Sequence, residues 1–68
     1  MSVLKVIEIM ASSTAGWEDA TAIAVKMAAK TVKEIRSVYI QDMSAVVKDN
    51  KITEYRVNVK ITFEVIKD

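Results

Sequence analysis

The side chains that could do chemistry in this sequence are carboxylates, lysines, arginines and tyrosines, because the chain has no cysteine and no histidine. That composition excludes disulfides, thiolate zinc sites, imidazole ligands, thiol nucleophiles and every catalytic triad with a histidine base. The remaining acids and bases could transfer protons, but no stretch of sequence brings together a nucleophile, a base and an oxyanion site. We therefore expect a protein that is not an enzyme.

The charged residues are balanced and scattered along the chain. Ten lysines and arginines stand against nine aspartates and glutamates, for a net charge of +1. No basic stripe is present, so we expect no nucleic-acid partner. Residues 1–5 lack a charged segment followed by a continuous apolar run, and Glu8 interrupts the apolar stretch that comes next. We therefore expect no signal peptide, no membrane partner and a cytoplasmic location.

Three single side chains have both a binding and a packing interpretation. Arg56 could bind an anion such as a nucleotide or coenzyme phosphate, although cross-strand pairing with a carboxylate is its more ordinary role. Trp17 could serve as a ligand platform, but packing in a core or a subunit contact is the more common use of such a residue. Tyr55 is most simply a core residue.

The elements that must position these groups are dominated by one long strand, residues 52–66. From Tyr55 to Val65 apolar and polar residues alternate without a slip, which is typical of a strand with one buried face. One face carries Tyr55, Val57, Val59, Ile61, Phe63 and Val65, and the other carries Glu54, Arg56, Asn58, Lys60, Thr62 and Glu64. At about 3.3 Å per residue the strand would be roughly 45–50 Å long, well beyond the usual five or six residues.

The rest of the chain predicts two more strands and one helix. Residues 3–10 read as a strand with apolar side chains on both faces, which places it inside a sheet or a subunit contact. Ser13 is the expected N-cap of a helix over residues 14–34. Residues 36–48 form the next strand, and Asp49-Asn50-Lys51 is a turn that makes the last two strands an antiparallel hairpin.

The predicted fold class is α+β, a single domain over residues 1–68 with the order β-α-β-β. Its three-stranded antiparallel sheet would wrap partly around one long helix. A chain of 68 residues buries only about 60% of its unfolded surface. A helix of roughly 30 Å is also too short to shield the whole last strand. We therefore expect a closed, symmetric oligomer.

Several segments resemble the dodecin family. They are Lys5-Val6-Ile7-Glu8-Ile9, Ser12-Ser13-Thr14-Ala15-Gly16-Trp17-Glu18-Asp19-Ala20, Thr31-Val32-Lys33-Glu34-Ile35, Glu54-Tyr55-Arg56-Val57 and Phe63-Glu64-Val65. The resemblance covers nearly the whole chain, and it rests on the order and spacing of these segments together. It implies a hollow homododecamer built from trimers, which in many members stores or buffers flavins without catalysing a reaction.

The same resemblance tests the flavin site. Flavin-binding members stack a tryptophan on the isoalloxazine ring and hydrogen-bond its polar edge with a glutamine. Aligned on Thr31-Val32, the tryptophan position falls on Ser37; aligned on Glu54-Tyr55, the glutamine position falls on Arg56. Tyr39 and Gln41 are expected to share the face of Ser37 and to line whatever pocket survives there. Flavin (riboflavin or FMN) binding is therefore the alternative function and not the first.

A second branch of the family, the calcium dodecins, is more similar. The shared features are Trp17-Glu18, Ile35-Arg36, Gln41-Asp42-Met43 and Tyr55-Arg56. This resemblance implies calcium as the cargo of a dodecameric shell.

Calcium takes six to eight oxygen ligands, and the sequence contains no Asp-rich binding loop. A site would have to be shared between subunits, where symmetry multiplies a lone carboxylate around a threefold axis. The candidates are Asp42, Glu54 and Glu64, with Asp49 at the turn; for any one of them a solvated or salt-bridged surface carboxylate is the more common role.

Overall fold

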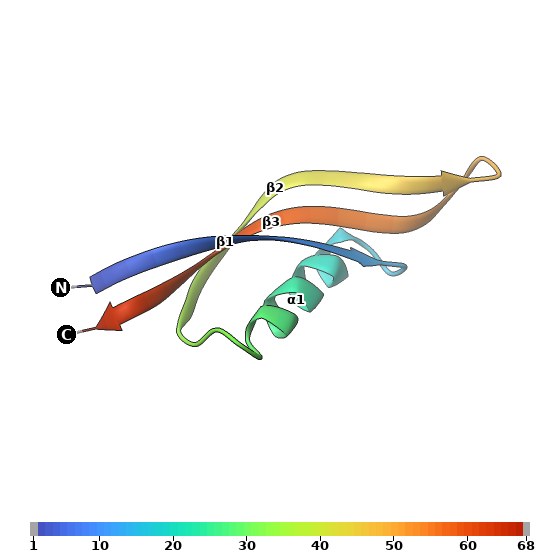
Figure 1. Ribbon diagram of the computed structural model, residues 1–68. Helices are drawn as coiled ribbons and strands as arrows, with labels where there is room; N and C mark the ends of the chain where they lie inside the picture. The colour runs from blue at the N-terminus through green and yellow to red at the C-terminus, as the bar shows by residue number, and fades with distance from the viewer. Residues whose placement is uncertain (1, 68) are drawn as a thin grey trace.

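The computed structural model describes the backbone of residues 2–67 and the side chains of residues 3–65. The elements are β1 (Ser2–Ser13), α1 (Trp17–Ala28), β2 (Ile35–Lys48) and β3 (Lys51–Lys67). The three strands form an antiparallel sheet in the order β1-β3-β2, and α1 lies across one face of it (Figure 1). The predicted α+β class and β-α-β-β order are confirmed.

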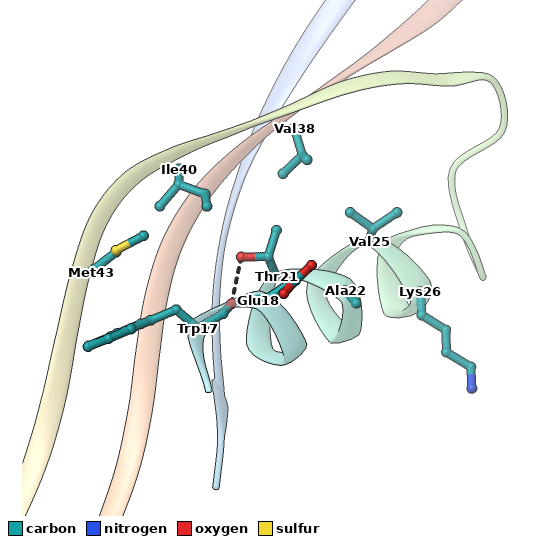
Figure 2. A pocket seen from close by; sticks show the side chains of 9 residues that line it. All are labelled: Trp17, Glu18, Thr21, Ala22, Val25, Lys26, Val38, Ile40 and Met43. Atoms are coloured by element: carbon teal, nitrogen blue, oxygen red, sulfur yellow. Dashed lines mark hydrogen bonds between the residues drawn. The ribbon is translucent and has the colours of Figure 1, made fainter. Parts of the chain in front are cut away.

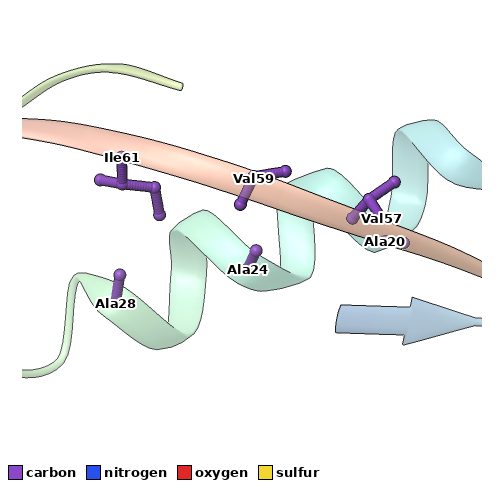
Figure 3. Packing of buried hydrophobic residues seen from close by; sticks show 6 residues of the cluster. All are labelled: Ala20, Ala24, Ala28, Val57, Val59 and Ile61. Atoms are coloured by element: carbon purple, nitrogen blue, oxygen red, sulfur yellow. The ribbon is translucent and has the colours of Figure 1, made fainter. Parts of the chain in front are cut away.

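The core is a contact between three alanines of the helix and three branched residues of the central strand. Ala20, Ala24 and Ala28 face Val57, Val59 and Ile61, and all six are at most 4% exposed (Figure 3). The spacing makes this possible, because four helical residues rise about 6 Å while two strand residues rise about 6.6 Å. Alanine lets the helix approach the sheet closely, as the alternation in β3 and the alanine-rich helix predict.

The helix is much shorter than predicted, and its predicted cap is wrong. Gly16 is the N-cap and makes no side-chain capping bond. The Ser13 hydroxyl instead accepts from the Ala15 N–H at 2.9 Å and donates to Asp19 Oδ2 at 2.6 Å. After Ala28 the chain turns, and Glu34 takes a φ of 61°, which a right-handed helix cannot contain.

Two further expectations about α1 and β1 need correction. The three-and-four spacing of small and apolar residues in the helix predicts that Met27 faces the sheet, but Met27 is 54% exposed. The break predicted after Met10 comes later, because residues 11–13 continue β1 and pair with Val57, Arg56 and Tyr55.

The sheet extends beyond the helix at both ends. The molecule measures 53 × 19 × 14 Å, whereas the 12 residues of α1 span about 18 Å. Figure 1 shows the β2–β3 hairpin projecting past one end of the helix, and the start of β1 and the end of β3 projecting past the other. Val65, predicted on the buried face, is 52% exposed for this reason.

The hairpin turn is as predicted. Asp49 and Asn50 have φ values of 52° and 64°, the left-handed conformation that a tight hairpin requires and that Asp and Asn tolerate.

Replacing Asn50 with valine should therefore lower the free energy of unfolding by about 1–2 kcal/mol, because a β-branched side chain clashes in the left-handed region. Asn50→Gly is the matched control and should stay near the parent. Urea unfolding of the three proteins measures both effects. If the valine variant were as stable as the parent, the turn would have another conformation.

Candidate functional site

The polar face of the sheet, opposite the helix, carries most of the predicted site residues. We call it the outer face; it consists of Arg56, Asn58, Lys60 and Thr62 of β3 and the residues paired with them. On β2 the pairs are Ser37 with Thr62, Tyr39 with Lys60, Asp42 with Asn58, and Ser44 with Arg56. These β3 residues point away from α1 because their neighbours Val57, Val59 and Ile61 pack against it.

An irregularity at Gln41 decides which β2 side chains lie on that face. The pairing shifts between Ile40 and Asp42, so Gln41 has no partner in the register. Strict alternation predicts Met43 on the face of Ser37, but the shift pairs Met43 with Val57 on the helix side instead. Asp42, and not Met43, therefore continues the outer face after Tyr39.

The two positions aligned with flavin contacts are not close together within one chain. Ser37 pairs with Thr62, whereas Arg56 lies six residues away along β3, a separation of about 20 Å at about 3.3 Å per residue. Tyr39 lies between them and is 65% exposed. A ligand that contacts both Ser37 and Arg56 would have to lie between subunits.

Arg56 is exposed and lines a shallow hollow of about 390 Å³ with Met10, Ala11 and Ser12. Its cross-strand partners are Ser12 and Ser44, so no carboxylate lies directly opposite it. An anion could therefore approach its guanidinium without competition from a paired strand neighbour.

Asp42 has a neighbour that sequence reasoning missed. Asn58 lies directly opposite it, and Cβ atoms of such pairs are about 4.5–5.5 Å apart. Asn58 Oδ1 is buried and has no hydrogen-bond partner within the described part of the chain. A carboxylate and an unused amide oxygen on adjacent strands are the ligand types that a hard cation prefers. Alternation places Asn58 on the polar face, but only the register places it beside Asp42.

The other two predicted metal ligands lie far from this pair. Glu54 is four residues from Asn58 along β3 and pairs with Val46, which places it about 13 Å away. Glu64 is six residues away on the other side, about 20 Å. Among residues 3–65, no three His, Cys, Asp or Glu side chains lie close enough together to hold a metal ion.

Glu64 is also engaged in an ion pair. Arg36 Nε donates to Glu64 Oε1 at 3.0 Å, its Nη2 donates to the same oxygen, and Nη2 lies 3.2 Å from Glu34 Oε1. The Glu64 side chain is 11% exposed, against 50% for Arg36. The hydrogen bond and charge of Glu64, with a smaller contribution from Glu34, raise the pKa of Arg36. Glu64 therefore has a structural role within one chain.

Replacing Arg36 with glutamine should lower the melting temperature, because it leaves the nearly buried Glu64 beside Glu34 without a cation. The raised pKa of Arg36 means that its contribution is complete below the ordinary arginine pKa and is lost only as the pH rises through the higher folded value. Deprotonation of Arg36 therefore adds no pH dependence between pH 6 and 9. Thermal melts of the parent and Arg36→Gln at low and high salt check the ion pair. The difference in melting temperature between the two proteins should shrink at high salt. A difference in melting temperature that grows with salt would contradict a stabilising ion pair.

A second hollow lies on the other face, between α1 and β2. This groove has a volume of about 590 Å³, and its apolar walls are Trp17, Val25, Val38, Ile40 and Met43. In Figure 2, Val38, Ile40 and Met43 point from β2 toward the helix, while the rim residues Glu18 and Lys26 belong to α1. The sequence did not predict the groove, because its Met43 wall depends on the shift at Gln41.

Trp17 closes one end of this groove and has a packing role. Its Nε1 donates to the Ser44 carbonyl at 2.9 Å, and its ring meets Tyr55 edge-on with centroids 4.9 Å apart. Tyr55, predicted as core, is half-buried in this contact. The indole therefore ties α1 to β2, in agreement with the packing interpretation of Trp17.

Comparison with known proteins identifies the fold. The Dodecin family profile matches residues 3–66. The chain belongs to the dodecin family. A protein of Mycobacterium tuberculosis named calcium dodecin is 44% identical over 66 residues, covering 94% of this chain and 90% of the relative.

Solved dodecin structures have the same fold. The crystal structure of the calcium dodecin from M. tuberculosis, described as calcium-chelating with a novel calcium-binding site, superposes with a TM-score of 0.82 at 34% identity, covering 98% of this chain and 96% of that one. A dodecin of Thermus thermophilus superposes with a TM-score of 0.91 at 22% identity, over 98% of this chain and all of that one. This last likeness shows the fold alone.

No helix in residues 2–67 of this dodecin is both long and apolar enough to span a bilayer.

Proposed function

We propose that this dodecin is a non-enzymatic, calcium-binding shell of twelve identical subunits, built from trimers and located in the cytoplasm. The observation that carries the calcium assignment is the pair of Asp42 and Asn58 on the outer face, which offers a carboxylate and an unused amide oxygen on adjacent strands. The 44% identity to a protein named calcium dodecin supports the same cargo.

The assembly is supported by apolar surface that one chain leaves uncovered. Among residues 3–65 the buried hydrophobic core has six residues, and a domain this small is marginal by itself. Large apolar side chains are exposed on all three strands: Leu4, Val6 and Met10 of β1, Met43 and Val47 of β2, and Ile52 and Val65 of β3. Monomeric proteins rarely expose apolar surface on this scale.

Assembly also completes the proposed site. One chain supplies two oxygen ligands at Asp42 and Asn58, whereas calcium takes six to eight. Waters and symmetry-related copies of the same pair can supply the remainder. Glu54 and Glu64 are weaker candidates, because they lie far along β3 from the pair and Glu64 is bonded to Arg36.

Native mass spectrometry of the purified protein, before and after calcium addition, tests both parts. We expect twelve subunits, a mass increase from bound calcium, and a higher melting temperature. At a calcium concentration of about 100 times Kd, the stabilisation per site is about 2.7 kcal/mol. A monomer would contradict the shell, whereas twelve subunits with no calcium gain would contradict only the cargo.

Replacing Asp42 with asparagine should weaken calcium binding at least tenfold, because it removes the charged ligand and keeps the shape. Glu54→Gln is the matched control, because it removes the same charge elsewhere on β3, about 13 Å from Asn58. Isothermal titration of both variants with calcium measures the difference. Equal loss in both variants would indicate a general charge effect, and loss in the control alone would move the site to Glu54.

Flavin is the alternative cargo. Ser37 offers no ring at the position aligned with the stacking tryptophan, but the exposed Tyr39 lies two residues along the same strand. A yellow preparation whose native mass includes riboflavin or FMN would favour flavin storage over calcium binding.

A further inference from the structure

No side chain of residues 3–65 fills the groove between α1 and β2. It is an open hollow with apolar walls and charged residues only at the rim, Glu18 and Lys26. Burial of apolar surface from water is favourable in proportion to area. A surface of this kind favours contact with another apolar surface. The parts of the sheet that extend beyond the helix are candidates to fill it.

The hairpin tip, residues 46–53, is the part of the sheet beyond the helix whose side chains match the groove. Val47 and Ile52 pair across the hairpin and are 60% and 53% exposed. The tip cannot fold back onto its own groove, because β2 is tied to Trp17 at Ser44 and runs on as a strand to Lys48. Figure 1 shows the tip directed away from α1.

The charges of the tip and the groove are complementary. Lys48 and Lys51 lie directly opposite each other at the end of the hairpin, an arrangement that is unfavourable without a nearby anion. The first turn of α1, at one end of the groove, carries Glu18 in the groove lining and Asp19 next to it, whose carboxylate also accepts from the Ser13 hydroxyl. An apolar pair followed by two lysines thus matches an apolar groove that has Glu18 at the Trp17 end, whereas the cation of its rim, Lys26, lies about two helical turns away.

We propose that the hairpin tip of one subunit occupies the α1–β2 groove of the next, with Lys48 and Lys51 beside Glu18 and Asp19. Tip and groove are different surfaces, so the contact is head-to-tail and closes into a ring when the rotation permits. This inference rests on the proposed assembly and names the contact that builds its trimers.

Aspartate substitutions at the two ends of β3 separate this contact from a general need for apolar surface. Ile52→Asp changes the tip, while Val65→Asp is the matched control on the same strand with nearly equal exposure, 53% against 52%. We expect Ile52→Asp to raise the subunit concentration for half-assembly at least tenfold by native mass spectrometry, and Val65→Asp to raise it clearly less. The reverse ranking would overturn the proposal.

Charge reversal keeps the test independent of folding, because all of the side chains concerned are exposed. Lys48→Glu with Lys51→Glu should weaken assembly, and so should Glu18→Lys alone. Mixing the two variants should give oligomers that contain both chains, because the reversed groove of one accepts the reversed tip of the other. Absence of such mixed oligomers, or full assembly of the lysine-to-glutamate variant alone, would overturn the contact.

The two proposals fail separately. A monomeric parent protein would refute both the shell and the tip contact. A dodecameric parent that is insensitive to Ile52→Asp and to the charge reversals would refute only the tip contact.

Discussion

Ala24→Leu is expected to destabilise this protein by about 1–3 kcal/mol or more, the usual cost of adding methylenes to a packed core. Ala24 is 1% exposed and sits at the middle of the contact between α1 and β3, where Val59 is 0% exposed. A leucine there must push the helix off the sheet or force side chains from their rotamers. Total stability in a chain of 68 residues is only about 3–10 kcal/mol, so the loss is a large fraction.

Ala29→Leu is the matched control, because Ala29 is exposed at the end of α1. Urea unfolding followed by circular dichroism compares the two variants with the parent at one protein concentration, since assembly contributes to apparent stability. Equal stability of the two leucine variants would contradict the close helix–sheet contact.

The double change Ser37→Trp with Arg56→Gln should raise riboflavin affinity at least tenfold, equivalent to about 1.4 kcal/mol. Tryptophan restores a stacking surface, worth about 0.5–1.5 kcal/mol beyond its burial. Glutamine both donates and accepts, whereas arginine only donates. The two positions lie about 20 Å apart in one chain, so the gain requires the assembled protein.

Fluorescence quenching of riboflavin measures the gain. The matched control is Ser44→Trp with Arg56→Gln, because Ser44 lies on the same face of β2 and directly opposite Arg56. An equal gain in the control would indicate non-specific stacking. No gain in either protein would mean that the shape of the intersubunit pocket, as well as its chemistry, differs from that of flavin-binding dodecins.

The candidate site was only partly predictable from the sequence. Alternation along β3 places Arg56 and Asn58 on the polar face, and Asp42 was a candidate from its residue type. The pairing of Asp42 with Asn58 depends on where the register of β2 shifts, and the residue types around Gln41 do not reveal that shift. Glu64 looked equally available in the sequence, but its ion pair comes from Arg36, 28 residues away.

The sequence by itself determined the order of elements, the buried face of β3 and the hairpin turn, because these depend on local periodicity and on the backbone preferences of single residues. It also indicated association, because the sheet is longer than anything one helix can cover.

Only the tertiary structure decided where the helix ends, which face Met43 takes and that a groove lies between α1 and β2. Each of these depends on contacts between distant segments: Glu34 adopts a positive φ where its carbonyl accepts from the Glu64 N–H, and Met43 follows the register of β2 against β3. Local patterns carry no record of such pairings, because the energy that selects them arises only when the segments meet.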